Sequence, residues 1–336
     1  MQAGPVLAET VAAGYSGPAP LTLWRGFTSW TLNVPAVFEI AVAAAYLIGA
    51  RRLRDRGTPW PAARLCAFLA GGIGSLLVVT AGPIGCYAGV LFWVRAVQNV
   101  TLLMIVPMFV AMGAPLTMLR ELASPGLLAR LSRLLHHRMA RRLTYPLVIT
   151  PIFVGPLPLI YLTRIYQASL EHSLVGALVA LWLLGAGWMY FWTRFRIDPT
   201  PRTDTYLVSL GISAAEVVLD GALGLVVWLG PLIAARYYHA LARPWGPSIR
   251  VDQIIGAGIL WIGGDLAGLP FLGVVLRRMT AEDAVQAAVI DAEMDRQDAE
   301  RAAAPATDQV SGAEEVEQPR LWWEDHPELA ERFRRR

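Results

Sequence analysis

The sequence predicts an all-α polytopic membrane protein, a bundle of seven transmembrane helices followed by an acidic and largely disordered C-terminal tail. Hydrophobic residues make up 55% of the 336 residues and charged residues only 16%, and the mean hydropathy is +0.45. Apolar stretches close to the roughly 20 residues that cross a bilayer recur along the chain. They are continuous rather than alternating, which favours helices over barrel strands.

The candidate spans follow one another with short connectors. Residues 1–33 lack the basic start and compact apolar core of a signal peptide, so we expect them to form an extracytoplasmic segment. The third and sixth stretches are long enough to tilt or to project beyond the hydrocarbon. The seven stretches are 34–50, 65–82, 87–115, 144–163, 174–193, 206–235 and 253–276, and they define a membrane domain over 34–278.

The orientation follows from the Arg residues in the connectors. The connectors 51–64, 117–143 and 194–205 are rich in Arg and all lie on one side of a seven-helix bundle. Because basic residues in short loops stay in the cytoplasm, this side is predicted to be cytoplasmic and the N-terminus outside. The connector 236–250 also carries three Arg and opposes this assignment. The expected location is therefore a plasma membrane that the chain crosses several times, with the C-terminus in the cytoplasm.

The composition also excludes several classes of protein. All 29 basic residues are Arg, so a retinal protein, which needs a Lys amine for its Schiff base, is excluded. The sequence contains no metalloprotease helix motif, nucleophile elbow, phosphate loop or dinucleotide fingerprint. We therefore expect a protein that is not an enzyme and does not bind nucleic acid.

The tail, residues 279–336, differs sharply from the membrane part. It holds 15 acidic residues and 7 Arg, a net charge of −8, whereas the whole chain is +3. Such composition cannot bury a core. Near its end, Trp322 and Trp323 could begin a short docking peptide, although a solvated tail explains the same residues.

Ionisable residues inside the predicted spans cost free energy and default to pairing or functional roles. Arg95 is the only cation among them, and we expect it to pair with Asp220 or Asp265 across the bundle. A buried pair that fixes helix register and a direct part in transport both fit this pattern. The intramembrane charge cluster comprises Glu39, Arg95, Glu216, Asp220 and Asp265.

Soft ligands form a second pattern. Met104, Met108 and Met112 recur at helical spacing on the third span; thioethers favour Cu(I), but such a stripe also packs well in a core. Cys86 is expected near the outer end of the third span, and Cys66 lies at the opposite face, so the two cannot pair. His172 and His239 fall in outer connectors and could join Cys86 around Cu(I) or Zn.

Two segments and a shorter run resemble a known family. They are L-F-W-V-R-A-V-Q-N-V-T-L-L-M-I-V-P-M-F-V-A-M-G-A-P-L at 91–116, R-P-W-G-P-S-I-R-V-D-Q-I-I-G-A-G-I-L-W-I-G-G-D-L at 243–266, and I-Y-Q-A-S-L-E-H-S-L at 165–174. They are similar to the seven-helix, membrane-integral CtaG-type cytochrome c oxidase assembly factors. The resemblance covers roughly 30–280, and its motif residues are Asn99, Gly113, Pro115, Asp252, Gln253, Gly256, Trp261 and Gly264.

The resemblance implies assembly of a haem–copper oxidase, with copper helped toward the oxidase near the outer membrane face. Its implied partners are the lipid bilayer, oxidase subunits or other respiratory components, and a copper chaperone; copper, bound transiently, is the implied cofactor. The family commonly has His where this chain has Arg95, Asn99, Gly176 and Ala180, so His172 alone is kept. A transporter for copper or a small solute and a scaffold that holds no metal stay open as alternatives.

Overall fold

The computed structural model describes residues 15–124, 144–195, 197–198, 206–263 and 287–297, with single positions between them. The chain forms two compact units, Met1–Met279 and Thr280–Arg336. The described part contains helices, turns and coil, and no strand. The all-α prediction is thereby confirmed for these residues.

The first half of the membrane unit contains three long helical rods. The first is α3 (Val34–Asp55), preceded by the one-turn helix α2 (Arg25–Thr28). The second rod joins α4 (Ala62–Cys66), the π-helical segment η2 (Ala67–Gly74) and α5 (Ser75–Thr80), and the third joins α7 (Phe92–Val100), the π-helical segment η3 (Thr101–Ile105) and α8 (Val106–Met112). The short helices α6 (Pro83–Tyr87) and α9 (Pro115–Leu122) lie before and after the third rod.

The second half is more broken. Its helices are α12 (Pro146–Val154), α13 (Pro156–Tyr161), α14 (Ile165–Glu171), α15 (Ser173–Phe195), α16 (Tyr206–Leu229), α17 (Ala235–Ala240) and α18 (Ile249–Gly258), which continues as the π-helical segment η4 (Ile259–Gly263). The predicted fourth span is thus two short helices that meet at Gly155. Residues 264 and 265 and most of the rest of the predicted seventh span lie outside the described residues.

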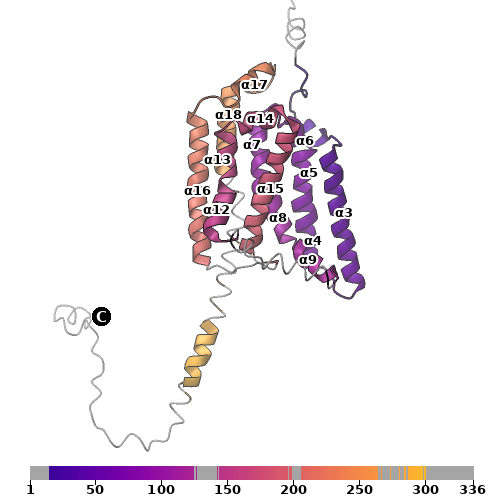
Figure 1. The fold of residues 1–336 in the computed structure, drawn as a ribbon, viewed down its shortest axis with the longest axis vertical. Coiled ribbons are helices and arrows are strands. Elements are labelled where there is room, and N and C mark those ends of the chain that lie inside the picture. Colours follow the sequence, from indigo (N-terminus) through magenta and orange to yellow (C-terminus); the bar gives the residue numbers. More distant parts are fainter. Residues whose placement is uncertain are drawn as a thin grey trace, which may run out of the picture. The chain divides into compact units, whose positions relative to one another are not determined.

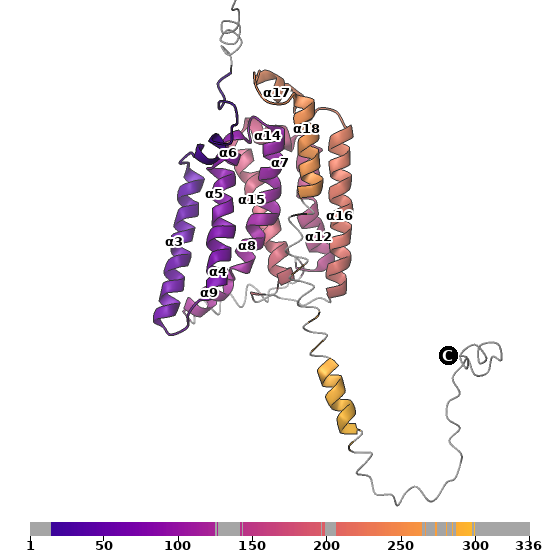
Figure 2. The same cartoon turned by 180° about the vertical axis from the view of Figure 1, so that it is seen from behind.

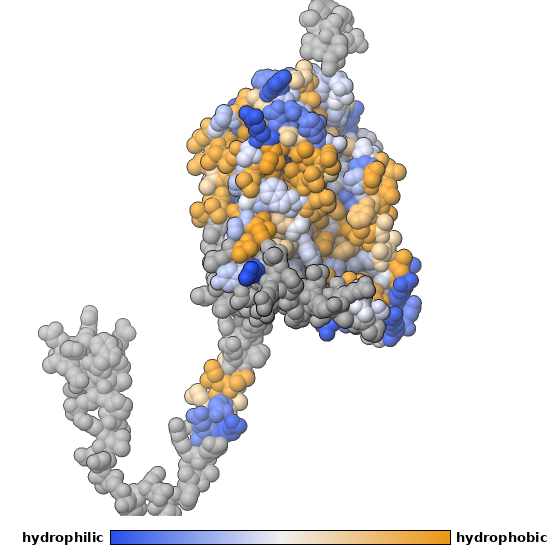
Figure 3. All heavy atoms as spheres, viewed as in Figure 1, coloured by the Kyte–Doolittle hydropathy of each residue, from blue (hydrophilic) through white to orange (hydrophobic). Residues whose placement is uncertain are grey.

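The long helices run side by side, and the short ones gather at the two ends (Figures 1 and 2). The helices α6, α14 and α17 mark one end of the bundle, called here the α17 end, while α4 and α9 mark the other, the α9 end. Apolar side chains cover the flank of the bundle, and hydrophilic residues gather at the α17 end and where α3 finishes (Figure 3). This is the distribution that a bilayer requires.

Four helical stretches among the described residues are long and apolar enough to cross a membrane: Val34–Asp55, Ala62–Tyr87, Phe92–Leu122 and Ser173–Phe195. Val217–Leu229 is a shorter apolar stretch within α16. A multi-helix membrane protein is therefore supported by length and composition. The number seven and the orientation stay predictions.

The third rod is the central one. Of its most apolar stretch 56% is buried inside the protein, against 22% for α3, and α15 packs along both η3 and α8. The third rod also accommodates a proline within its length. The π-helical segment η3 directly precedes the turn that holds Pro107, and such wider turns accommodate the missing hydrogen bond of a proline.

The rod ends where Ala114 adopts a left-handed conformation, with φ of 53°, and Pro115 then starts α9. The break leaves the carbonyl of Gly113 without a helical partner, and the Tyr46 hydroxyl of α3 donates to it at 2.7 Å. A freed carbonyl inside a membrane protein needs such a partner.

Gly187 sets how closely α15 approaches the third rod. A Cβ atom at this position would collide with the carbonyl oxygen of Leu103 and lie 2.8 Å from Cγ of Pro107. We predict that Gly187→Ala lowers the free energy of unfolding by about 1–3 kcal/mol, the usual cost of overpacking. Unfolding of the purified protein in mixed micelles of increasing SDS content measures this.

Gly185 provides the matched control. It lies two residues away on α15, and a Cβ there meets no atom within 4 Å. Gly185→Ala should leave stability unchanged or raise it slightly, because Ala favours the helix. Equal destabilisation by both substitutions would show that close packing at Gly187 does not matter.

Candidate functional site: a capping centre and a polar cluster at the α17 end

Asp252, at the start of α18, caps a different helix. The N-cap position of α7, Leu91, offers no side-chain acceptor. Instead, Oδ1 of Asp252 accepts a hydrogen bond from the backbone N–H of Trp93 at 2.9 Å, and the N–H of Phe92 also bonds to this carboxylate. The negative charge thus lies where unpaired N–H groups and the helix dipole favour it.

Arg243 holds the same carboxylate in place. Its Nη2 lies 3.2 Å from Oδ2 of Asp252, and both side chains are buried. The guanidinium also donates to the carbonyl oxygens of Trp245 at 2.7 Å and Pro247 at 2.8 Å. The connector before α18 is therefore folded around one cation, which explains an Arg in a loop that the sequence places outside. Arg243 therefore has a structural role in this loop that does not depend on which side of the membrane the loop lies.

Burial raises the pKa of the Asp252 carboxyl, while the N–H groups of Trp93 and Phe92 and the charge of Arg243 act in the opposite direction. Burial is the larger effect. The carboxylate is therefore one whose charge depends on its partners being in place.

Gln253 and Arg250 bind the end of α16. The Gln253 amide accepts from the N–H of Ile233 at 2.8 Å and donates to the carbonyl oxygens of Val227 and Pro231 at 2.8 and 2.9 Å. Arg250 donates to the carbonyl oxygens of Gly230 and Trp228. The last carbonyls of α16, which have no helical partner, are thereby satisfied.

Gly256 and Trp261 complete the motif by packing. A Cβ at Gly256 would collide with the ring of Phe92, so this glycine lets α18 lie directly against α7. Trp261 packs on Gly221 and Gly224 of α16, where a Cβ would come within 3.2 Å and 2.7 Å of it. The capping centre, defined as Arg243, Arg250, Asp252 and Gln253, therefore joins α7, α16 and α18. Gly264 lies outside the described residues.

A polar cluster lies on α7 below this centre. Arg95 donates from Nη1 to Oε1 of Gln98 at 2.9 Å and from Nη2 to Oγ of Ser169 at 3.0 Å. Asn99, which is 1% exposed, donates to the Tyr161 hydroxyl at 3.0 Å.

Aromatic rings surround these polar groups. The rings of Phe92, Tyr161 and Tyr166 pack against one another, and the Tyr166 and Tyr238 hydroxyls share a hydrogen bond of 2.8 Å. Burial raises the pKa of Tyr238 far above its ordinary value, so its hydroxyl stays protonated. The cluster is neutral except for Arg95.

The family model described as cytochrome c oxidase caa3 assembly factor matches residues 44–282. This match covers most of the chain and includes both the capping centre and the polar cluster. The chain belongs to the Caa3_CtaG family.

The curated proteins that are similar to this chain come from mycobacteria. Uncharacterized proteins of Mycobacterium bovis and Mycobacterium tuberculosis are each 29% identical over 279 residues, which is 80% of this chain and 42% of theirs. One from Mycobacterium leprae is 27% identical over 282 residues, 81% of this chain and 43% of its own. The chain thus spans less than half the length of these relatives. No solved structure matches it.

Among the described residues, the hydrogen-bond partners of Arg95 are the neutral side chains of Gln98 and Ser169. Arg95 forms no ion pair with Asp220, which lies partly buried on α16. Glu39 is on α3, hydrogen-bonded to Thr80. The side chain of Glu216 and the whole of Asp265 lie outside the described residues. Of the two predicted partners of Arg95, Asp220 is thus excluded, and the pairing with Asp265 stays a prediction.

Two of the positions where the resemblance to the Caa3_CtaG family implied His, 95 and 176, meet at Ser169 in the structure. Arg95 bonds to Ser169, and a Cβ at Gly176 would come within 2.9 Å of the Ser169 carbonyl oxygen. A His at position 176 would have no room while α14 stays where it is. Ala180 is partly buried against the hydrophobic core, and His172 is exposed at the end of α14.

The candidate metal ligands are not gathered into one centre. No group of three or more His, Cys, Asp and Glu able to hold a metal occurs in the described part of the chain. Cys86 lies on α6 rather than on the third rod, and its thiol donates to the Ser29 carbonyl at 3.5 Å. His239 is exposed on α17. Met104 and Met108 are buried in the core, and Met112 packs against it, which is the packing role of such a stripe.

Asp198 is a key residue that the sequence analysis missed. It is 4% exposed, and its carboxylate accepts from the N–H groups of Leu116 and Thr117 at 3.1 and 2.6 Å and from the Thr117 hydroxyl. It thus caps α9, just after the break at Pro115. The sign of this role in the sequence is that Asp198 is an acidic residue within the Arg-rich connector 194–205.

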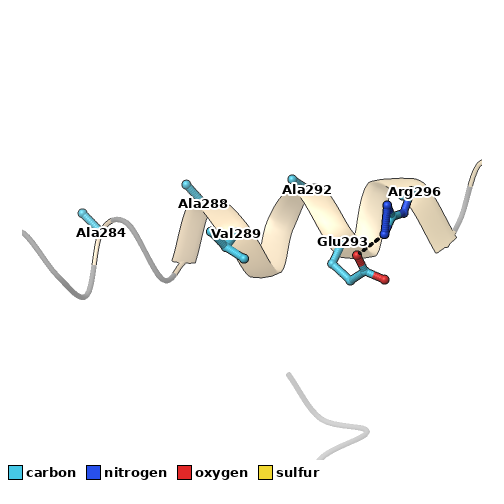
Figure 4. Close-up of a pocket in the computed structure, with 6 residues that line it drawn as sticks. All are labelled: Ala284, Ala288, Val289, Ala292, Glu293 and Arg296. Carbon is cyan, nitrogen blue, oxygen red and sulfur yellow. Dashed lines mark hydrogen bonds and ion pairs between the residues drawn. The ribbon is translucent and has the colours of Figure 1, made fainter.

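The described part of the tail, chiefly residues 287–297, gives no candidate site. Trp322 and Trp323 lie outside the described residues. The described tail helix presents a shallow hollow lined by one helix alone, with an exposed ion pair of 2.9 Å between Glu293 and Arg296 (Figure 4). Exposed pairs of this kind contribute little to stability.

The capping centre yields a direct prediction. Asp252→Asn leaves Arg243 buried without a counter-charge, and losing one member of a buried pair costs about 3–5 kcal/mol. We expect a loss of this order in the free energy of unfolding, measured by SDS titration of the purified protein.

Two further variants test the assignment. Asp55→Asn changes an exposed acid at the end of α3 and should leave stability unchanged. The double variant Asp252→Asn with Arg243→Met removes the unpaired charge and should recover part of the loss. Equal stability of Asp252→Asn and the native protein would contradict the capping role.

Proposed function

We propose that this chain assists the assembly of a haem–copper cytochrome c oxidase in a bacterial plasma membrane. The observation that carries the proposal is the family match over 44–282, which includes the capping centre. The membrane-spanning character of the described helices agrees with a partner that is itself embedded in the bilayer. Oxidase subunits are the expected partners.

Within this function, we propose that the chain aids copper insertion near the outer membrane face while a partner chaperone carries the metal. The support is twofold. Arg95 places a cation where the resemblance implied a neutral ligand, and like charge repels a copper ion. In addition, Cys86 and His172 belong to no metal-holding group among the residues that the structure describes.

The alternative within the same function is that the chain holds copper itself. It would then use Cys86, His172 and His239, with the thioethers of the Met stripe as soft ligands. The buried positions of Met104 and Met108 speak against it, because a ligand in transit needs access.

A deletion strain tests the function. Terminal-oxidase activity and the copper content of its membranes should both fall relative to the parent, at limiting copper. Added copper should restore them if the chain acts on copper insertion, and should fail to do so if it acts only as a scaffold. Unchanged oxidase content would sink the proposal and favour a transporter.

Complementation tests which residues hold the metal. A variant with Cys86→Ser, His172→Ala and His239→Ala should restore oxidase activity to within about twofold of the native gene, because the proposal places copper elsewhere. Immunoblots must show equal amounts in the membrane. A triple variant that is present but restores less than a tenth of the activity would show that these side chains carry copper.

A further inference from the structure

A partly open apolar cavity lies away from the capping centre and the polar cluster. It measures about 210 Å³, and its walls come from α3, η2, α5, α8 and α15. Every residue that lines it is apolar except Glu39, and the walls include Phe68, Leu76, Val110 and Leu184. Glu39 is therefore the one ionisable residue among those that line this apolar cavity.

Glu39 is 4% exposed, and its carboxylate has one hydrogen-bond donor among the described residues, the Thr80 hydroxyl. The Thr80 hydroxyl lies 3.0 Å from Oε2 of Glu39 and 2.9 Å from the carbonyl oxygen of Leu76. A hydroxyl has one hydrogen to donate, so it cannot serve both acceptors at once. Oε1 of Glu39 accepts no hydrogen bond from any residue that the structure describes. An ionised carboxylate so placed is costly unless a cation or donor joins it.

The shape of the cavity limits what can enter. Phe68 and Leu76 are eight residues apart along the second rod, which corresponds to roughly 12 Å. Glu39 hydrogen-bonds to Thr80, at the end of this rod nearer the α17 end. The carboxyl group thus lies at one end of an elongated apolar space. A helix, whose diameter is about 10–12 Å, does not fit into a volume of about 210 Å³, whereas a single hydrocarbon chain does.

The cavity is also placed to receive a ligand from the bilayer. It is formed against α3, the least buried of the four described helices that are long and apolar enough to cross a membrane, and α3 lies at the edge of the bundle in both views (Figures 1 and 2). Phe38, which lines it, is 70% exposed. Glu39 is five residues after the start of α3, about 8 Å along the helix, within reach of a lipid head group.

We propose that this cavity binds a bilayer lipid with a primary ammonium group, which pairs with Glu39 while one acyl chain occupies the apolar walls. Charge complementarity selects the ammonium, and the cavity dimensions select a chain. The proposal does not rest on oxidase assembly, and either can fail without the other.

Photolabelling of the full-length protein in nanodiscs tests it. The probes are a phosphatidylethanolamine and a phosphatidylglycerol, each with a diazirine in one acyl chain, used at equal mole fraction in separate samples. Mass spectrometry of peptides then locates the label. We expect the ethanolamine probe to label the cavity-lining parts of α3, α8 and α15 about tenfold more than the glycerol probe, corresponding to roughly 1.4 kcal/mol.

Matched variants separate charge from shape. Glu39→Gln keeps the size of the side chain and should abolish the preference between the two probes. Leu184→Trp fills the cavity and should abolish labelling there by both. Glu171→Gln, an exposed acid on α14, should change nothing. Thr80→Val removes the hydroxyl that lies next to Glu39 but keeps the Glu39 carboxyl. The preference for the ethanolamine probe should therefore persist.

Two results would overturn the proposal: equal labelling of the native cavity by both probes, or an unchanged ethanolamine preference in the Glu39→Gln variant. If Glu39→Gln lowers the thermal midpoint, the comparison of the two probes on the native protein still decides, because it needs no variant.

Discussion

The packing of the bundle depends on a carboxylate of one helix, α18, that caps the start of another, α7. The N–H groups at the start of α7 have no helical partner, and little water would be available to them near a membrane. Asp252 of α18 supplies the acceptor, and Arg243 compensates its charge. Gln253, the next residue, satisfies the end of α16. Two adjacent side chains thus tie three helices together, and the glycine one turn later lets those helices approach.

The same requirement explains the far end of the third rod. The chain breaks at Gly113 and Pro115, and the groups freed there find partners on elements distant in sequence: Tyr46 on α3 and Asp198 after α15. Gly187 then lets α15 lie against the π-helical turn between the two halves of the rod. The central helix is therefore irregular in its middle and fixed at both ends by other helices, which makes its position in the bundle a property of the whole fold.

The polar cluster includes two positions, 95 and 99, where the resemblance to the family implied His. Arg95 and Asn99 lie on one face of α7 and bond to Ser169 and Tyr161 from the α13–α14 region. A large cation at position 95 and a glycine at position 176 meet at the same serine. The substitutions are consistent with one another sterically, and together they give a hydrogen-bonded cluster. This member of the Caa3_CtaG family therefore has a hydrogen-bonded arginine at this place.

The sequence by itself determined the helical class and the apolar character of the long helices, because hydropathy is a property of neighbouring residues. The Asp252–Gln253 motif was indicated by the resemblance to the family. The sequence also indicated the family through its motifs. It could not supply the partner of Arg95 or the role of Asp198, since both depend on which helices meet in space. The isolated carboxyl of Glu39 was visible as a charge in a span, but only the tertiary structure decided that it lies at the end of an apolar cavity. Long-range pairing of polar groups is set by packing, and packing has no local signature in the chain.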